Sequence, residues 1–462
     1  MNKTNKRTPE FRRTLQTYSQ LKESGVQWLG QVPEHWEVKR LKYLVSAPLQ
    51  YGASEESGQN EEGDPRFIRI TDIREDGTLR DESFCSLPVE VAKPFMLEDG
   101  DLLFARSGAT VGKSFMYRSA FGKACFAGYL IRARIDKAKA EQKFINYFTS
   151  SPSYWQWLAS SSIQSTIQNV NAEKYNSLAL PLPPLAEQRA IAAYLDRETA
   201  RLDTLISRQQ RMIELSLEKR RALIGHAVTR GLDKSAPLRD SGVEWLGLVP
   251  AHWNDARKMK EVSSLKGRLG WQGLKADEYR EQGPYVVSSA HFKELHIKWE
   301  LCPHISSERY ELDSNIQLRE GDVLLMKDGA ALGKLAWVDK LPDRACLNSH
   351  LLLFRSRQHS GEDLYIPQFI FFLLQSEHFQ EFIKVNATGT TFLGISQETI
   401  GNYRVTLPPI SEQRAIVSYL DSETAKIDTL IEKARRAIEL MREHRSALIA
   451  AAVTGQIDVR AA

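Results

Sequence analysis

The chain has 462 residues, of which 42% are hydrophobic and 26% are charged. This is enough apolar material to bury sizeable cores, and the length alone suggests about three domains. The 62 Lys and Arg residues nearly balance the 58 Asp and Glu residues, which leaves a formal net charge of +4. The composition excludes a histone-like or polybasic protein, so any surface that binds nucleic acid must be local.

The cysteines and the N-terminal segment indicate a protein of the reducing cytoplasm. The four cysteines are widely spaced, with no CxxC pair and no Cys/His cluster, so we expect neither a zinc site nor a disulfide framework. The first residues are polar, and no run of about 18 apolar residues occurs in the chain. We therefore expect a soluble, cytoplasmic protein with no signal peptide and no membrane span.

Three motifs occur twice, in the same order, which divides the chain into two similar halves. The pairs are SGVQWLGQVPEHW (Ser24–Trp36) with SGVEWLGLVPAHW (Ser241–Trp253), EDGDLLFARSGATVGK (Glu98–Lys113) with REGDVLLMKDGAALGK (Arg319–Lys334), and LPPLAEQRAIAAYLDRETARLDTLI (Leu182–Ile206) with LPPISEQRAIVSYLDSETAKIDTLI (Leu407–Ile431). The offset between the copies grows from 217 to 221 and then to 225 residues. Shared motifs are typical of a scaffold, and the divergent regions indicate one domain put to two different uses.

In chain order we expect five segments. These are an N-terminal tail (1–23), to which we assign no role, a first divergent domain (24–181), a first long helix (182–233), a second divergent domain (234–406) and a second long helix (407–462). Each divergent domain mixes short alternating stretches, such as FIRITDI and YVVSSA, with turns and a short helical patch before the proline motif. This mixture predicts an α+β fold.

After each proline motif, apolar residues recur at helical spacing, with no Gly or Pro before Gly225 in the first copy and Gly455 in the second. Each stretch predicts a helix of about 40 residues, near 60 Å long. The steps of three and four residues favour an antiparallel coiled coil between the two helices, and the alternative is that each helix packs on its own domain. The predicted seam contains Ile191, Leu195, Leu202, Leu205, Ile213 and Leu223 in the first helix and Ile416, Leu420, Ile427, Leu430, Ile438 and Leu448 in the second.

The sequence SGATVGKS (Ser107–Ser114) is similar to a phosphate-binding P-loop but departs from it in two ways. Ser107 takes the place of the first glycine of GxxxxGK[ST], and the second copy has Leu335 in place of the Mg²⁺-binding hydroxyl. We interpret the motif as a tight turn between two strands, in which Gly108 and Gly112 allow positive φ. No HExxH, GxSxG, GxGxxG, methyltransferase tetrapeptide or restriction-nuclease motif occurs, so we predict a chain with no catalytic residues, metal or cofactor of its own.

The divergent regions and the turn motif contain cations, amides and aromatic residues that suit phosphate and base-edge contacts. For any one of these residues, a solvated surface position is the alternative interpretation. The candidate DNA-binding residues are Arg66, Arg69, Arg74, Arg106, Lys113, Gln164, Thr166, Lys266, Arg268, Trp271, Gln272, Lys327, Lys334, Thr390 and Thr391.

The three motifs and their repetition resemble the specificity subunits of type I DNA restriction–modification systems, and the resemblance covers nearly the whole chain. It implies two target recognition domains, each reading one half of a bipartite, asymmetric DNA site in the major groove. It also implies that the helix pair holds the domains apart as a ruler and docks two modification subunits, which bind S-adenosylmethionine and methylate adenines. Restriction subunits would add ATP- and Mg²⁺-dependent translocation and cleavage.

Two alternatives stay open at the level of the sequence. One is a scaffold whose two domains bind proteins instead of DNA. The other is an autonomous nuclease or methyltransferase, which none of the motifs supports.

Overall fold

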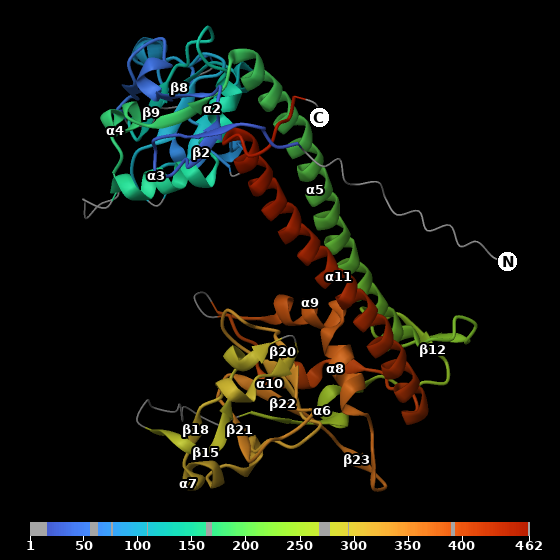
Figure 1. The fold of residues 1–462 in the computed structure, drawn as a ribbon. Helices are drawn as coiled ribbons and strands as arrows, with labels where there is room; N and C mark the ends of the chain where they lie inside the picture. The colour runs from blue at the N-terminus through green and yellow to red at the C-terminus, as the bar shows by residue number, and fades with distance from the viewer. Residues whose placement is uncertain are drawn as a thin grey trace, which may run out of the picture. The chain divides into compact units, whose positions relative to one another are not determined.

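The computed structural model describes residues 16–55, 63–74, 77–108, 110–162, 169–267, 278–293, 295–389 and 393–460 (Figure 1). The chain divides into two compact units. Unit 1 contains Met1–Gln209 and Arg436–Ala462, and unit 2 contains Gln210–Arg435. Each unit therefore holds one divergent domain together with a part of each long helix.

An antiparallel sheet of four strands forms the centre of the divergent domain in unit 1. Its strands, in spatial order, are β4 (Gln50–Tyr51), β9 (Leu130–Ala133), β6 (Leu102–Ala105) and β7 (Ser114–Met116). Successive side chains of β6 enter two different cores, because side chains alternate between the faces of a strand. Both faces of this sheet are therefore covered.

The remaining elements of this domain are short. They are the hairpin of β1 (Leu21–Glu23) and β2 (Gln31–Pro33), the antiparallel pair of β3 (Glu37–Arg40) and β10 (Ala179–Leu182), the parallel pair of β5 (Arg66–Ile68) and β8 (Ala124–Phe126), and the helices α1 (Val89–Ala92), α2 (Gln142–Phe148), α3 (Pro152–Ser162) and α4 (Ala172–Asn176). Residues 16–23, which we predicted to belong to a tail, thus contribute a strand to unit 1. Residues 1–15 of that tail lie outside the described residues.

Unit 2 repeats this topology although its sequence differs. Its four-stranded sheet has the order β14 (Ser263–Lys266), β22 (Leu351–Ser356), β19 (Val323–Met326) and β20 (Leu335–Trp337). The other strands are β11 (Leu238–Asp240), β12 (Leu248–Pro250), β13 (Arg257–Lys258), β15 (Tyr279–Val287), β16 (Phe292–Lys293), β17 (His296–Ile297), β18 (His304–Ile305), β21 (Ala345–Leu347), β23 (Gln358–His359), β24 (Glu362–Asp363) and β25 (Arg404–Val405). The helices of this domain are α6 (Met259–Val262), α7 (Ser307–Glu311), α8 (Pro367–Gln375), α9 (Glu377–Asn386) and α10 (Gln397–Asn402). The predicted α+β class and the internal symmetry are confirmed.

The two long helices are α5 (Leu185–Arg230, 46 residues) and α11 (Ile410–Val453, 44 residues). In unit 1 the start of α5 shares a core with the end of α11, and in unit 2 the end of α5 shares a core with the start of α11. Two ion pairs at equivalent positions join the helices: Arg445 Nε lies 3.1 Å from Asp203 Oδ1, and Arg220 Nε lies 3.3 Å from Asp428 Oδ1. The predicted antiparallel pairing is confirmed.

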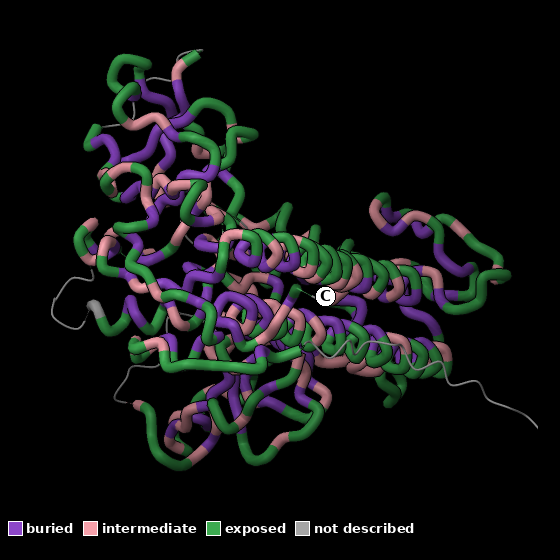
Figure 2. Tube along the Cα trace, turned by 45° about the horizontal axis from the view of Figure 1, so that its top comes forward, coloured by how far each residue is buried: buried purple, intermediate pink, exposed green. Residues whose placement is uncertain are grey.

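The seam of this pair differs from the prediction at one equivalent position in each helix. Leu205 and Leu430 are 37% and 44% exposed, whereas the neighbouring Ile206 and Ile431 are buried. The prediction for these two leucines is wrong. In α5, steps of three and four residues lead from the buried Thr199 to Leu202 and then to Ile206, so the isoleucine and not the adjacent leucine lies in the seam. Of the remaining predicted seam residues, Leu202, Ile213 and Leu223 are partly buried, and Ile191, Leu195, Ile416, Leu420, Ile427, Ile438 and Leu448 are buried. Figure 2 shows the exposed and buried residues that result along both helices.

Candidate nucleic-acid interface

The first and third shared motifs meet at a buried carboxylate. In unit 1, Glu187 is 5% exposed and accepts hydrogen bonds from Trp36 Nε1 at 3.0 Å and from the Tyr18 hydroxyl at 2.6 Å, and His35 Nε2 lies 2.8 Å from its other oxygen. Burial and this carboxylate raise the pKa of Tyr18 far above its usual range. The packing of the domain on its helix thus explains why the first and third motifs occur together in each half of the chain.

Unit 2 repeats the arrangement with fewer donors. Glu412 accepts from Trp253 Nε1 at 3.1 Å, and His252 Nε2 lies 2.7 Å from its Oε2. The glutamine that follows each of these glutamates also bonds to its domain. Gln188 Oε1 accepts from the Glu141 backbone N–H at 2.8 Å, and Gln413 Oε1 accepts from the Ile366 backbone N–H at 2.9 Å. Those two N–H groups stand at the N-caps of α2 and α8.

The second shared motif also contains a structural carboxylate. Asp101 is 1% exposed and forms a two-point ion pair with Arg134, at 2.9 Å for each contact. Asp322 forms the equivalent pair with Arg355 at 2.8 and 2.6 Å. The repeated acidic residues therefore build the scaffold, and the groups that differ between the units must be sought elsewhere.

The glycine-rich part of this motif is a turn between two strands in both units, as predicted. It joins β6 to β7 in unit 1 and β19 to β20 in unit 2. Its glycines have φ values of 80° and 84° for Gly108 and Gly112, and of 79° and 85° for Gly329 and Gly333. In this left-handed region a side chain is strained, which accounts for glycine at all four places.

In unit 1, this turn meets the segment that precedes the third motif. A β-bridge joins Ser107 to Asn169, and the Arg106 guanidinium lies 5.0 Å from the centre of the Tyr51 ring. Tyr51 and Tyr129 are 38% and 66% exposed. We define the first corner as Tyr51, Arg106, Ser107, Tyr129 and Asn169. It presents a cation, exposed aromatic rings and small polar groups, which are the groups that bind phosphates and bases.

In unit 2, the equivalent turn meets the equivalent segment. A β-bridge joins Asp328 to Gly394, and the Gly329 N–H donates to Leu393 O at 2.8 Å. The Asp328 carboxylate lies between two basic side chains: Lys327 Nζ is 3.1 Å from Oδ2, and His350 Nδ1 is 2.5 Å from Oδ1. We define the second corner as Lys327, Asp328, His350 and Gly394.

The two corners have the same backbone hydrogen bonds but different side chains. The matching bonds are Arg106 N–H to Tyr129 O and Lys327 N–H to His350 O, both 3.0 Å, and Val170 N–H to Arg106 O and Ile395 N–H to Lys327 O, both 2.8 Å. Arginine and tyrosines in the first corner are thus replaced by lysine, aspartate and histidine in the second. The same backbone frame therefore carries two different sets of side chains.

The predicted arginines of β5 and the following loop are held by partners within unit 1. Arg66 is 7% exposed and donates to Arg80 O at 2.5 Å and to Asp81 Oδ1 at 3.3 Å, so it is a buried structural residue and not part of a DNA-facing surface. Arg69 is bound to the buried Asp72 at 3.0 Å. Arg74 is exposed and donates to Glu82 at 3.0 Å. These pairings could not be seen from the arginine spacing alone.

The remaining candidates divide into described and undescribed residues. Lys113 and Lys334 are exposed at the ends of the two turns, and Lys334 Nζ donates to Ser289 O at 3.2 Å. Lys266 is half-buried at the end of β14. The candidates outside the described residues are Gln164, Thr166, Arg268, Trp271, Gln272, Thr390 and Thr391. In the sequence, Gln164 and Thr166 precede Asn169 of the first corner, and Thr390 and Thr391 precede Gly394 of the second.

Sequence reasoning missed Tyr51, Tyr129, Asp328 and His350. A signal was available for three of them: at the offset of 221 residues, Tyr129 aligns with His350 and Ser107 aligns with Asp328. Ser107 and Asp328 lie inside the second shared motif, and Tyr129 and His350 follow it at the same offset. Tyr51 had no such signal, because it lies in the divergent region.

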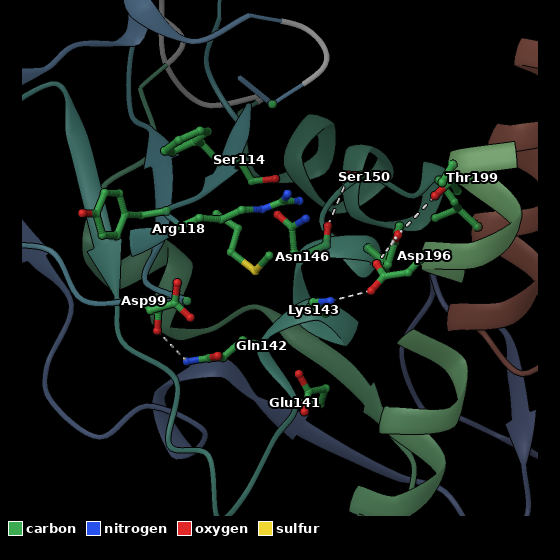
Figure 3. Close-up of a pocket in the computed structure, with 18 of the residues that line it drawn as sticks. Asp99, Ser114, Arg118, Glu141, Gln142, Lys143, Asn146, Ser150, Asp196 and Thr199 are labelled. Carbon is green, nitrogen blue, oxygen red and sulfur yellow. Dashed lines mark hydrogen bonds and ion pairs between the residues drawn. The ribbon is translucent and has the colours of Figure 1, made fainter. Parts of the chain in front are cut away.

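A separate hollow of about 730 Å³ lies in unit 1 between β7, α2 and the long helices (Figure 3). Its Asp196 accepts from Lys143 Nζ at 2.5 Å and from the Tyr147 hydroxyl at 2.8 Å. In unit 2 the place of Tyr147 is taken by Phe372, which is buried with Phe371. The lining is therefore not repeated, and its mixed charges select no class of ligand.

The part of the chain that the structure describes contains no group of three or more His, Cys, Asp or Glu residues placed to hold a metal ion. Within the same residues, no helix combines the length and the apolarity needed to cross a membrane. The four cysteines are buried thiols.

Comparison with known proteins gives consistent matches over almost the whole chain. The family described as type I restriction modification DNA specificity domain matches residues 33–215 and 253–440. The type I restriction enzyme MjaVIII specificity subunit of Methanocaldococcus jannaschii is 24% identical over 442 residues, which cover 93% of this chain and 94% of the relative. The EcoKI specificity subunit of Escherichia coli K12 is 24% identical over 450 residues, covering 93% and 91%. A chain from a structural study of complex assembly and conformational transition of the type I R-M system has a TM-score of 0.71 at 18% identity and covers 92% of this chain and 99% of its own.

Proposed function

We propose, on the premise that this chain belongs to the type I restriction–modification DNA specificity family, that its two divergent domains read the two halves of a split, asymmetric DNA target. As a specificity subunit the chain supplies target recognition and is not itself an enzyme, and the catalytic activities lie on partner subunits. Each divergent domain is then a target recognition domain. The family match removes the support for the alternative of a scaffold that binds only proteins.

The observation that carries the proposal is the pair of corners. Both have the same backbone frame. In the sequence, the candidates Gln164 and Thr166 precede Asn169 of the first corner, and Thr390 and Thr391 precede Gly394 of the second. Their side chains differ, so two different half-sites are expected. Arg106 places a cation in the first corner and Lys327 places one in the second, and Lys and Arg contacts to phosphate make binding depend on salt.

We further propose that the helix pair docks two modification subunits. Leu205 in α5 and Leu430 in α11 are exposed, and so are Leu215 and Leu440, which are related by the same offset of 225 residues. Exposed leucines at equivalent positions of two helices suit two copies of one partner. S-adenosylmethionine, and ATP and Mg²⁺ for restriction, would be bound by the partners, and the modified base would be adenine.

The experiment is a map of N6-methyladenine in a methylation-free host that expresses this chain with its modification subunit. We expect one split motif with two unlike halves and a fixed spacer. A continuous palindromic motif, or methylation that does not depend on this chain, would contradict the proposal. A titration of the purified complex against specific and competitor duplexes at two salt concentrations separates loss of DNA binding from loss of methylation.

A further inference from the structure

The second corner carries a carboxylate on a surface that is expected to face phosphates. Asp328 is held by Lys327 and His350, and its side chain is 20% exposed. The equivalent residue of the first corner is Ser107, which has no charge. A carboxylate near DNA phosphates is repelled by them, so its presence at this place needs a reason.

The neighbours of Asp328 reduce that repulsion without occupying the carboxylate completely. One oxygen is bound to His350 and the other to Lys327, and each carboxylate oxygen has two acceptor sites. The backbone is fixed by the β-bridge to Gly394, and a Cβ added at Gly394 would lie 3.1 Å from Asp328 Cβ, so the segment packs closely against this side chain. The acceptor is thus preorganised and still partly accessible.

We infer that Asp328 is a specificity-determining residue of the second recognition domain and accepts a hydrogen bond from an exocyclic amino group of cytosine or adenine in the major groove. This inference rests on the proposed function. Amino groups are the donors that bases present there, and a carboxylate accepts from them and repels the acceptor-only edge of guanine or thymine. Lys327 and His350 act as positioning residues that hold the carboxylate.

The comparison of the two corners supports the same assignment. Lys327 replaces Arg106, His350 replaces Tyr129 and Asp328 replaces Ser107. Lys327 and His350 are the two side chains that bind the Asp328 carboxylate. The second corner therefore differs from the first by one connected group built around a single acceptor.

The test uses the complex of the full chain with its modification subunit and maps methylated adenines for the variants Asp328→Asn and Asp328→Ser. Both should relax or change one base position in one half of the motif, with discrimination at that position reduced about 10- to 100-fold. The other half should be unchanged. Binding to non-specific duplex should be kept or strengthened, because a negative charge has been removed.

Two further variants complete the design. Ser107→Asp should change the half-site that the first domain reads and leave the half-site of the second domain intact. Asp363→Asn, in the exposed hairpin of β23 and β24, should change neither half-site. The inference is overturned if Asp328→Asn keeps the wild-type motif, or if it lowers affinity for all sequences equally, as a structural role would. Failure of the wild-type complex to give a split motif would overturn the proposed function itself, which is a different outcome.

Discussion

The indole Nε1 of Trp36 donates a hydrogen bond of 3.0 Å to Glu187, across 151 positions of the chain. The Tyr18 hydroxyl donates to the same carboxylate, which is buried. This contact joins the start of the first recognition domain to the start of α5. The equivalent contact in unit 2, between Trp253 and Glu412, lacks the tyrosine.

The first prediction compares these two carboxylates. Glu187→Ala leaves the buried donors of Tyr18 and Trp36 without an acceptor, and we expect it to reduce the free energy of unfolding by about 2–4 kcal/mol. Glu412→Ala should cost less, because that side chain is 25% exposed and accepts from fewer groups. Urea unfolding of both variants measures the difference. An equal or larger loss for Glu412→Ala would contradict the account of the joint.

The second prediction concerns the seam of the helix pair. Ile431→Asp places a charge at a position that is 5% exposed, so we expect a loss of about 3–5 kcal/mol of stability. Leu430→Asp, one residue earlier and 44% exposed, should change stability by about 0.5 kcal/mol or less. Thermal unfolding of the two variants provides the comparison. If both are equally destabilising, the seam does not follow the 3-4 spacing.

The variant Leu430→Asp also tests the proposed docking of modification subunits. Leu430→Asp should fold normally and bind one modification subunit instead of two, because the proposed docking surface on one side has been changed. Native mass spectrometry of the complex reads the stoichiometry directly. A complex that still contains two modification subunits would show that this leucine does not dock them.

The third prediction concerns pH. Burial raises the pKa of Cys125 and of Cys302 to about 12, from an ordinary value of 9.0. The unfolded chain therefore loses these protons at lower pH than the folded chain, and stability should fall as the pH rises from 9 toward 12. Cys125→Ala and Cys302→Ala should each flatten that fall relative to the wild type. Unchanged slopes would show that the thiols do not contribute.

Much of this architecture could be predicted from the sequence, because the repeat and the helical periodicity are local properties of the chain. The helix pair and the turn with Gly108 and Gly112 are of this kind. The sequence does not show that Ile206 and not Leu205 lies in the seam, because these two adjacent apolar residues fit the helical period equally well. Arg66 was misassigned because its partner Asp81 is brought to it only by folding.

The fourth prediction tests the helices as a spacer. Seven residues inserted after Gln209 in α5, together with seven after Ala434 in α11, keep the seam in phase and add about 10 Å to each helix. The gap between the half-sites should grow by about 3 base pairs at ~3.4 Å each, with both half-sites unchanged. Methylation mapping of the double-insertion variant shows the new spacer. An altered half-site with an unaltered spacer would mean that the helices do not set the distance.

The most direct measurement of the central claim maps methylated adenines for two single variants, Arg106→Ala in the first corner and Lys327→Ala in the second. Each corner is proposed to read its own half-site, so each variant should relax one half of the split motif and leave the other half as in the wild type. The two variants should affect opposite halves. Relaxation of the same half by both variants, or of neither half, would contradict the account.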